Sequence, residues 1–181
     1  MSTTILLALE VGSSCRELKS FKNASGFADY VWTELCKSYL GASDKDYIYN
    51  GLTEKLWPYF KDTQKPYFER IVLAITYDRA FICKDDYSEA ARCIRQFLSK
   101  YPPNPSHSNH WADIADFFES KPKHESVGFI QSSVVGNLFR HDTYLHDPEF
   151  RYSPGYNSGL EFVEKNNCFN VFSNTPIASE E

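Results

Sequence analysis

Three groups of residues have side chains from which an enzyme site could be built. His107 and His110 lie three positions apart beside prolines, a spacing that could ligate a metal ion, but no third ligand follows at helical spacing. Asp85 and Asp86 are adjacent carboxylates that helix capping alone would explain. The third group is a polar run within residues 140–157. We therefore expect no metal site.

The segment 140–157 mixes acids, bases and hydrogen-bond donors, as the site of a small hydrolase could. Its candidate residues are Arg140, His141, Asp142, Tyr144, His146 and Asp147. An exposed polar loop has the same composition, and no nucleophile motif accompanies the run. We favour the loop interpretation and keep a hydrolase-type site as the alternative function.

Neither a reactive cysteine nor a nucleotide site is favoured elsewhere. Cys15 would be a reactive thiolate only at a helix N-terminus, and an ordinary loop cysteine is the favoured interpretation. The glycine-containing stretches 12–15 and 49–53 lack the spacing and the following lysine of a phosphate-binding loop. The sequence thus predicts no catalytic residues and no cofactor.

An amphipathic helix after Asp86 is the clearest element that could position functional groups. Its apolar residues recur at steps of three and four and share one face: Tyr87, Ala90, Ala91, Ile94, Phe97, Leu98 and Tyr101. Asp86 is the expected N-cap, with Glu89 returning the bond as in a capping box. Pro102 and Pro103 then end the helix.

Further helices are predicted on both sides of this one. Ser25 can cap a helix that Gly41 ends, and Pro58 must kink or end a short helix over 52–60. Pro66 suits the first position of a helix that reaches about Leu73, although the apolar run could also form a strand. A last helix, over 110–118, places four apolar residues on one stripe, namely Trp111, Ile114, Ala115 and Phe118.

The remaining apolar runs predict strands. They cover residues 3–9, 79–83, 126–134, 160–164 and 169–173, and the first of these runs is short enough that it could also form a helix. In the third of these runs, Gly128 marks a bulge or a close backbone approach. Strands separated by helices predict an α/β (α+β) fold, in which one domain over residues 1–181 packs a mixed β-sheet against several helices.

Composition narrows the expected partners and compartment. The chain has 181 residues, a net charge of -5 and a pI near 5.6, which oppose binding to nucleic acid and fit a basic protein partner. Five cysteines without paired spacing predict no disulfide framework, and Cys83 and Cys93 are expected in the core. No run could span a bilayer and no basic region precedes the first apolar run, so we expect a cytoplasmic protein. The sequence leaves the oligomeric state open.

Four short motifs carry a resemblance to a known class of proteins. They are Thr-x-Asp-Arg at 76–79, Lys-Asp-Asp at 84–86, His-Trp at 110–111 and Gln-Ser-Ser-Val at 131–134. Over residues 71–139 this pattern resembles the small bacterial immunity proteins of contact-dependent toxin systems. The resemblance implies a cytosolic inhibitor that binds a cognate protein toxin and occludes its active site.

A toxin-binding surface is expected in the polar loops, because the helices and strands need their apolar residues for the core. Surplus acids and rings occur in the runs 44–49 and 142–147, and acidic residues can pair with a basic toxin. The expected interface residues are Asp44, Asp46, Tyr47, Tyr49, Asp142, Tyr144 and Asp147.

Overall fold

The fold is built on a five-stranded mixed sheet in the order β2-β1-β4-β3-β5. This computed structural model of the chain describes residues 2–9, 16–23, 27–46, 51–77, 80–105, 110–132 and 168–177. The strands are β1 Ser2–Ala8, β2 Arg16–Asn23, β3 Ala80–Cys83, β4 Ser126–Ser132 and β5 Phe169–Asn170. All neighbours pair antiparallel except β3 and β5, which are parallel. The predicted α/β class with a mixed sheet is confirmed.

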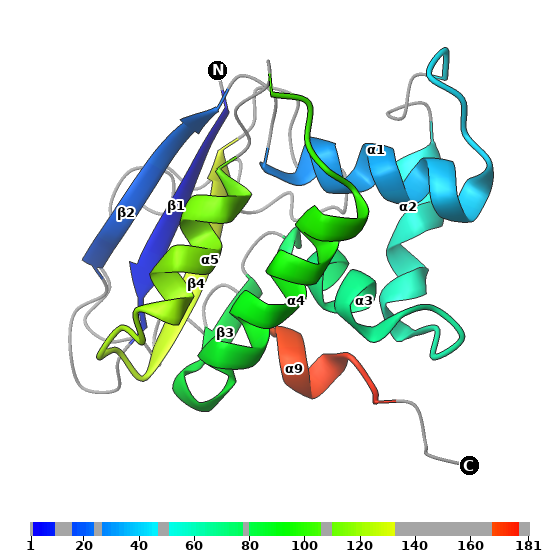
Figure 1. Cartoon of the computed structure of the whole chain (residues 1–181). Coiled ribbons are helices and arrows are strands. Elements are labelled where there is room, and N and C mark those ends of the chain that lie inside the picture. Colours follow the sequence, from blue (N-terminus) through cyan, green and yellow to red (C-terminus); the bar gives the residue numbers. More distant parts are fainter. Residues whose placement is uncertain are drawn as a thin grey trace.

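Helices form the second layer. They are α1 Phe27–Leu40, α2 Leu52–Leu56, α3 Tyr67–Ile75, α4 Tyr87–Lys100, α5 Trp111–Glu119 and α9 Val171–Asn174, with the 3-10 helices η1 Trp57–Lys61 and η2 Lys84–Asp86. Figure 1 shows α4 and α5 in front of the sheet, with α1, α2 and α3 beyond the β3 side. No helix among these described segments has the length and apolar character needed to cross a membrane.

The predicted amphipathic helices bury the faces that their periodicity selects. All four residues of the α5 stripe are at most 1% exposed. On α4, Tyr87, Ile94 and Phe97 are each 1% exposed and pack into the same core as α5. Gly41 ends α1 with a φ of 67°, which glycine adopts without the cost that a side chain brings.

Two predicted helix starts are wrong in detail. Asp86 makes no side-chain cap bond, because it ends η2 with helical backbone angles, and a cap needs an extended backbone there. The Glu89 carboxylate instead accepts from Arg92 Nε at 2.8 Å. Pro66 precedes α3 as its N-cap and has an extended ψ of 133°, so the helix begins one residue later and runs on to Ile75.

The strand predictions hold best in the centre of the sheet. β1, β3 and β4 lie in the predicted runs, whereas the edge strand β2 was not predicted at all. The predicted strand 169–173 is a strand only at Phe169–Asn170. There the Asn170 side chain accepts from Ser173 N at 3.1 Å and starts α9. The predicted strand 160–164 lies outside the described residues.

Gly128 is the close backbone approach that the sequence predicts. A Cβ atom at this position would lie 2.8 Å from Leu9 Cδ1, and Leu9 is 3% exposed. The backbone of β4 therefore comes this near to Leu9 only because position 128 has no side chain.

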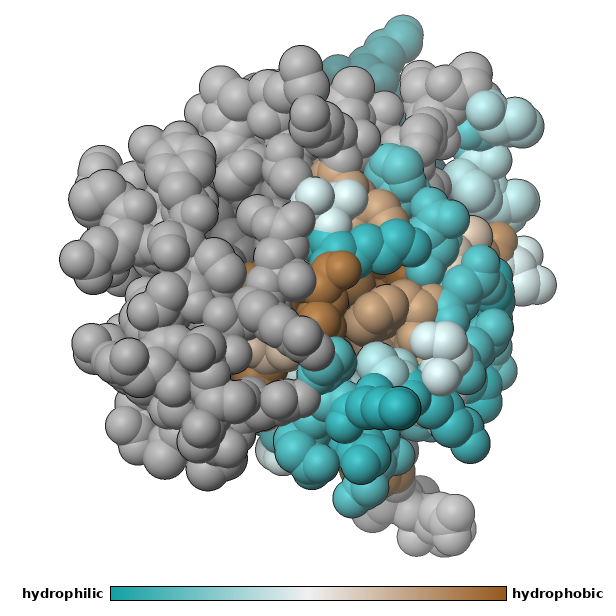
Figure 2. All heavy atoms as spheres, turned by 90° about the vertical axis from the view of Figure 1, so that its left-hand side faces the viewer, coloured by the Kyte–Doolittle hydropathy of each residue, from teal (hydrophilic) through white to brown (hydrophobic). Residues whose placement is uncertain are grey.

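The hydrophobic interior reaches the surface on one side. Figure 2 looks onto the side of the molecule where β2 lies and shows hydrophobic side chains bordered by hydrophilic ones. On β2 and α5 the partly buried hydrophobic residues that pack against the core are Leu18 and Phe117.

Candidate interaction surface

Helix α3 buries two consecutive charged residues. Glu69 is 0% exposed and Arg70 is 1% exposed, and the five residues after them, 71–75, are all fully buried. Ionised groups are costly to bury unless every charge is met by partners. The partners of these two residues therefore show what the fold fixes here.

Glu69 joins three helices through its carboxylate. Oε2 accepts from the Tyr39 hydroxyl of α1 at 2.5 Å, and Oε1 accepts from Lys100 Nζ of α4 at 2.5 Å. The Tyr101 hydroxyl donates to Oε1 at 3.1 Å. Burial raises the pKa of Tyr39, and the bond to Glu69 adds to this effect. The hydroxyl therefore stays protonated and keeps donating.

Tyr30 extends the same network along α1. Its hydroxyl donates to the carbonyl of Tyr101, and its ring meets Phe97 edge-on at a centroid distance of 5.7 Å. Burial also raises the pKa of Tyr30, helped by the nearby charge of Glu34. Two tyrosines of α1 are thus fixed against the end of α4.

Arg70 binds main-chain carbonyl groups. Nε donates to Lys65 O at 3.1 Å, while Nη1 donates to Pro176 O at 2.7 Å and lies 3.5 Å from Phe60 O. The guanidinium also lies 5.5 Å from the centre of the Tyr67 ring. Arg70 therefore connects η1, the start of α3 and the C-terminal segment.

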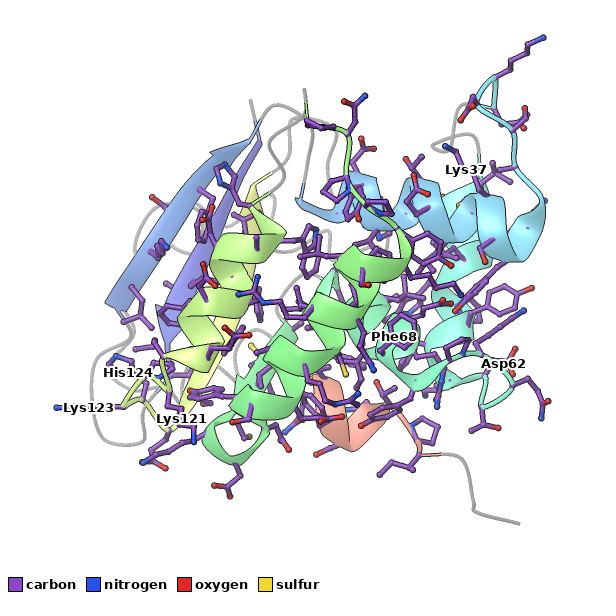
Figure 3. The ribbon with its side chains drawn as sticks, viewed as in Figure 1. Lys37, Asp62, Phe68, Lys121, Lys123 and His124 are labelled. Carbon is purple, nitrogen blue, oxygen red and sulfur yellow. The ribbon has the colours of Figure 1, made fainter. Side chains whose placement is uncertain are left out.

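We call the group Tyr39, Tyr59, Lys65, Glu69 and Arg70 the helix corner. The rings of Tyr39 and Tyr59 lie 5.2 Å apart and are tilted by 56°, and both side chains remain partly exposed. In Figure 3, Asp62 marks the connection between η1 and α3 at the edge of the molecule, and Phe68 marks the α3 side facing α4. The corner thus presents two partly exposed tyrosine rings beside the Lys65 ammonium, which lies 4.5 Å from the centre of the Tyr39 ring.

The two predicted interface residues that the structure describes lie on one turn after α1. The Asp46 carboxylate accepts from Ser43 N at 2.6 Å and from Ser43 Oγ at 2.8 Å. The backbone bond from Ser43 lowers the pKa of Asp46, so the turn keeps its charge in mild acid. Asp44 is 86% exposed and pairs with Lys37 Nζ at 2.6 Å. This acidic turn is rigid and open to solvent.

The other predicted interface residues lie outside the described ranges. These are Tyr47, Tyr49, Asp142, Tyr144 and Asp147. The alternative hydrolase segment, 140–157, lies there too, as do His107 and Cys15. The structure therefore brings together only Asp44 and Asp46 from the predicted surface.

The remaining chemical candidates have local structural roles. His110 Nδ1 lies 3.0 Å from Asp113 Oδ2 at the start of α5, and its ring contacts Phe21 at 5.2 Å. Within the described part of the chain, no group of His, Cys, Asp and Glu residues could hold a metal ion. Asp85 and Asp86 lie side by side, and burial together with Asp85 raises the pKa of Asp86.

The two cysteines that were expected in the core differ in their burial. Cys93 is fully buried as predicted, and burial raises the pKa of its thiol to about 12. The prediction for Cys83 is wrong, because this residue ends β3 and is partly exposed. There the Asn170 side chain donates to its sulfur at 3.4 Å.

The net charge is distributed unevenly along the chain. Of the 24 acidic and 19 basic residues, 15 of each kind lie in the described ranges. The other residues hold nine acidic and four basic side chains, so they carry the whole charge of -5. The described framework is therefore neutral, and the acidic excess lies in the rest of the chain, which includes Glu180 and Glu181.

Sequence reasoning missed the helix corner, although one signal was available. The run Ile71–Ile75 is apolar at every position, and a helix that is apolar all round is a buried helix. Glu69 and Arg70 directly precede this run in the same helix, so the run indicates that they lie near the core. Comparisons with protein-family models, curated proteins and solved structures returned no match to this chain.

Proposed function

We propose that this chain is an immunity-type protein that binds a cognate bacterial toxin and blocks its active site. The observation that carries this proposal is the acidic turn Ser43–Asp46, which holds Asp44 and Asp46 in fixed, exposed positions. A rigid charged turn loses little conformational entropy on binding and can meet lysines or arginines of a basic toxin.

The charge distribution supports the same proposal. The chain as a whole carries a net charge of -5, and a negative net charge speeds the approach of a basic partner. The motif resemblance over residues 71–139 points in the same direction. An inhibitor of this kind needs a stable surface, and the framework supplies helices on which loops can be fixed.

The direct test is binding to the toxin encoded beside this gene. The purified pair should associate with a Kd below about 1 μM, and co-expression should protect cells from the toxin. Three interface variants should weaken binding, namely Asp46→Lys, Tyr47→Ala and Tyr144→Ala. Of these, Asp46→Lys should mainly slow association and respond to salt.

A matched control separates a specific surface from a general charge effect. Asp85 is an exposed acidic residue on η2, directly before α4. Asp85→Lys therefore makes the same charge change as Asp46→Lys at a different element. It should slow association much less than Asp46→Lys does. A purified pair that does not associate below micromolar concentration would refute the proposal.

A further inference from the structure

Lys65 has an unusually well fixed backbone for a surface lysine. Its N–H donates to Asp62 O at 3.0 Å, and its carbonyl accepts from the buried Arg70 guanidinium at 3.1 Å. Pro66 follows with φ held at -54°. The position from which this side chain projects is therefore set on both sides.

The side chain of Lys65 lies over two tyrosine rings. Its ammonium is 4.5 Å from the ring centre of Tyr39 and 5.3 Å from that of Tyr59. A cation above aromatic faces is held there by about 0.5–1 kcal/mol at exposed sites. Within the described residues, no carboxylate forms an ion pair with Lys65. The two rings therefore orient the ammonium, and no carboxylate of the described residues neutralises it.

Both halves of this arrangement depend on buried charges of α3. Glu69 fixes the Tyr39 ring through the bond of its carboxylate to the hydroxyl, and Arg70 fixes the Lys65 main chain. The two charged residues are adjacent and almost fully buried. Because such burial is costly, what they hold in place is a defined part of the fold.

We propose that Lys65, Tyr39 and Tyr59 form a docking site for a carboxylate side chain on the partner protein. This inference rests on the proposed function, because the partner is the toxin. The ammonium can form a charge-assisted hydrogen bond to the carboxylate, and the partly exposed Tyr59 lies beside it. The tyrosine faces offer rigid apolar area, which is typical of residues that dominate interfaces.

A basic toxin and a carboxylate at the contact are compatible. Net charge acts over many ångströms and governs the rate of approach, whereas a single oriented ammonium acts at contact. The described part of the chain carries equal numbers of acidic and basic residues, and Lys65 can select an acidic side chain at contact. Lys65 then determines which part of the toxin surface lies over α1 and η1.

The experiment measures the affinity of the full chain for the toxin encoded beside this gene. Lys65→Met keeps the apolar stem and removes the charge, and it should weaken binding about tenfold or more, mainly through faster dissociation. The control is Lys55→Met, since Lys55 is an exposed lysine on α2. That variant should bind within about twofold of the wild type. Equal melting temperatures of both variants show that the fold is intact.

A charge swap tests the chemistry of the partner side chain. Lys65→Glu should weaken binding further, and a toxin variant with a lysine in place of the matching carboxylate should restore it. Tighter binding by Lys65→Glu would overturn the carboxylate assignment. Wild-type affinity for Lys65→Met would overturn the docking site while leaving the proposed function intact. Failure of the wild-type chain to bind the toxin would overturn both.

Discussion

The outer face of α4 and α5 and the helix corner use the same residue types in opposite ways. On the outer face, Arg95 donates to Asp116 and to Glu119, and these side chains lie largely in solvent. In the corner, Glu69 and Arg70 are buried and meet hydroxyl groups, an ammonium and main-chain carbonyls. Exposed pairs add little stability, whereas removing one partner of a buried set leaves groups unsatisfied.

The comparison shows in which of the two regions polar contacts determine how the helices pack. The α4–α5 pairing would persist without its ion pairs, because Tyr87, Ile94 and Phe118 already pack it. Apolar side chains of α1, η1 and α9 also pack against α3 in the corner, but Glu69 and Arg70 add buried polar groups there that need partners. Matched substitutions in the two regions test whether buried polar contacts contribute more stability than exposed ion pairs do.

The largest effect is expected for Arg70→Leu against Arg95→Leu. The first change leaves the carbonyls of Lys65 and Pro176 without their buried donor, and it should lower the free energy of unfolding by about 3–5 kcal/mol. The second removes an exposed pair and should cost about 0.5 kcal/mol or less. Urea unfolding followed by tryptophan fluorescence measures both. Similar losses for the two variants would contradict the comparison.

The next effect concerns the carboxylates. Glu69→Leu deprives the Tyr39 and Tyr101 hydroxyls of their acceptor and should cost about 2–3 kcal/mol. Lys100 adds little to this loss, because it is 47% exposed and can turn into water. Glu89→Leu, which removes the exposed partner of Arg92 on α4, is the control and should change stability by about 0.5 kcal/mol at most. Urea unfolding of Glu69→Leu and Glu89→Leu measures both losses, and equal losses would contradict the prediction.

Alkaline pH should remove the stability that the hydroxyl groups of Tyr30 and Tyr39 contribute. The folded state raises the pKa of Tyr30 and Tyr39 above the ordinary value near 10, chiefly through burial. Their contribution is therefore complete below pH 10 and is lost as the pH rises above it. Unfolding free energies measured across this range should fall with pH. The fall should be smaller in Tyr39→Phe, and an unchanged slope would exclude Tyr39 as its source.

The smallest effect should be a gain. Thr53 Oγ1 on α2 is buried and has no hydrogen-bond partner among the described residues. Thr53→Val replaces this hydroxyl with a methyl group of similar size and should stabilise the protein by up to about 1 kcal/mol. A thermal scan is sufficient to detect the shift. Destabilisation would mean that the hydroxyl has a partner after all.

Periodicity predicted which faces of α4 and α5 are buried and which are exposed, but it did not predict the helix corner. The stripes of α4 and α5 are visible because each apolar residue follows another at three or four positions. Glu69 and Arg70 could not be identified in this way, since a charged residue in a sequence ordinarily indicates solvent. Their burial depends on helices α1 and α4, which lie about thirty residues away on either side.

The sheet edges show the same limit. Strand β2 reads RELKSFKN, in which charges outnumber apolar residues, and such composition suits an edge that must not pair with other chains. β5 is only two residues long, and the Asn170 cap converts the rest of its apolar run into α9. Of the candidate interface, the sequence located the acidic turn. The tyrosine–lysine arrangement depends on tertiary contacts that no local pattern encodes.

The parallel pair β3–β5 has a consequence for the order of folding. Ala80 pairs with Phe169, and the Arg70 guanidinium reaches Pro176, 106 residues away along the chain. Closing loops of this length costs entropy before any contact compensates for it, so these pairings should form late. During synthesis, the Arg70 guanidinium would bind only nearby carbonyls such as that of Lys65 until the last ten described residues leave the ribosome. Mature protein should correspondingly open first at this C-terminal seam, where hydrogen exchange should be fastest among the paired strands.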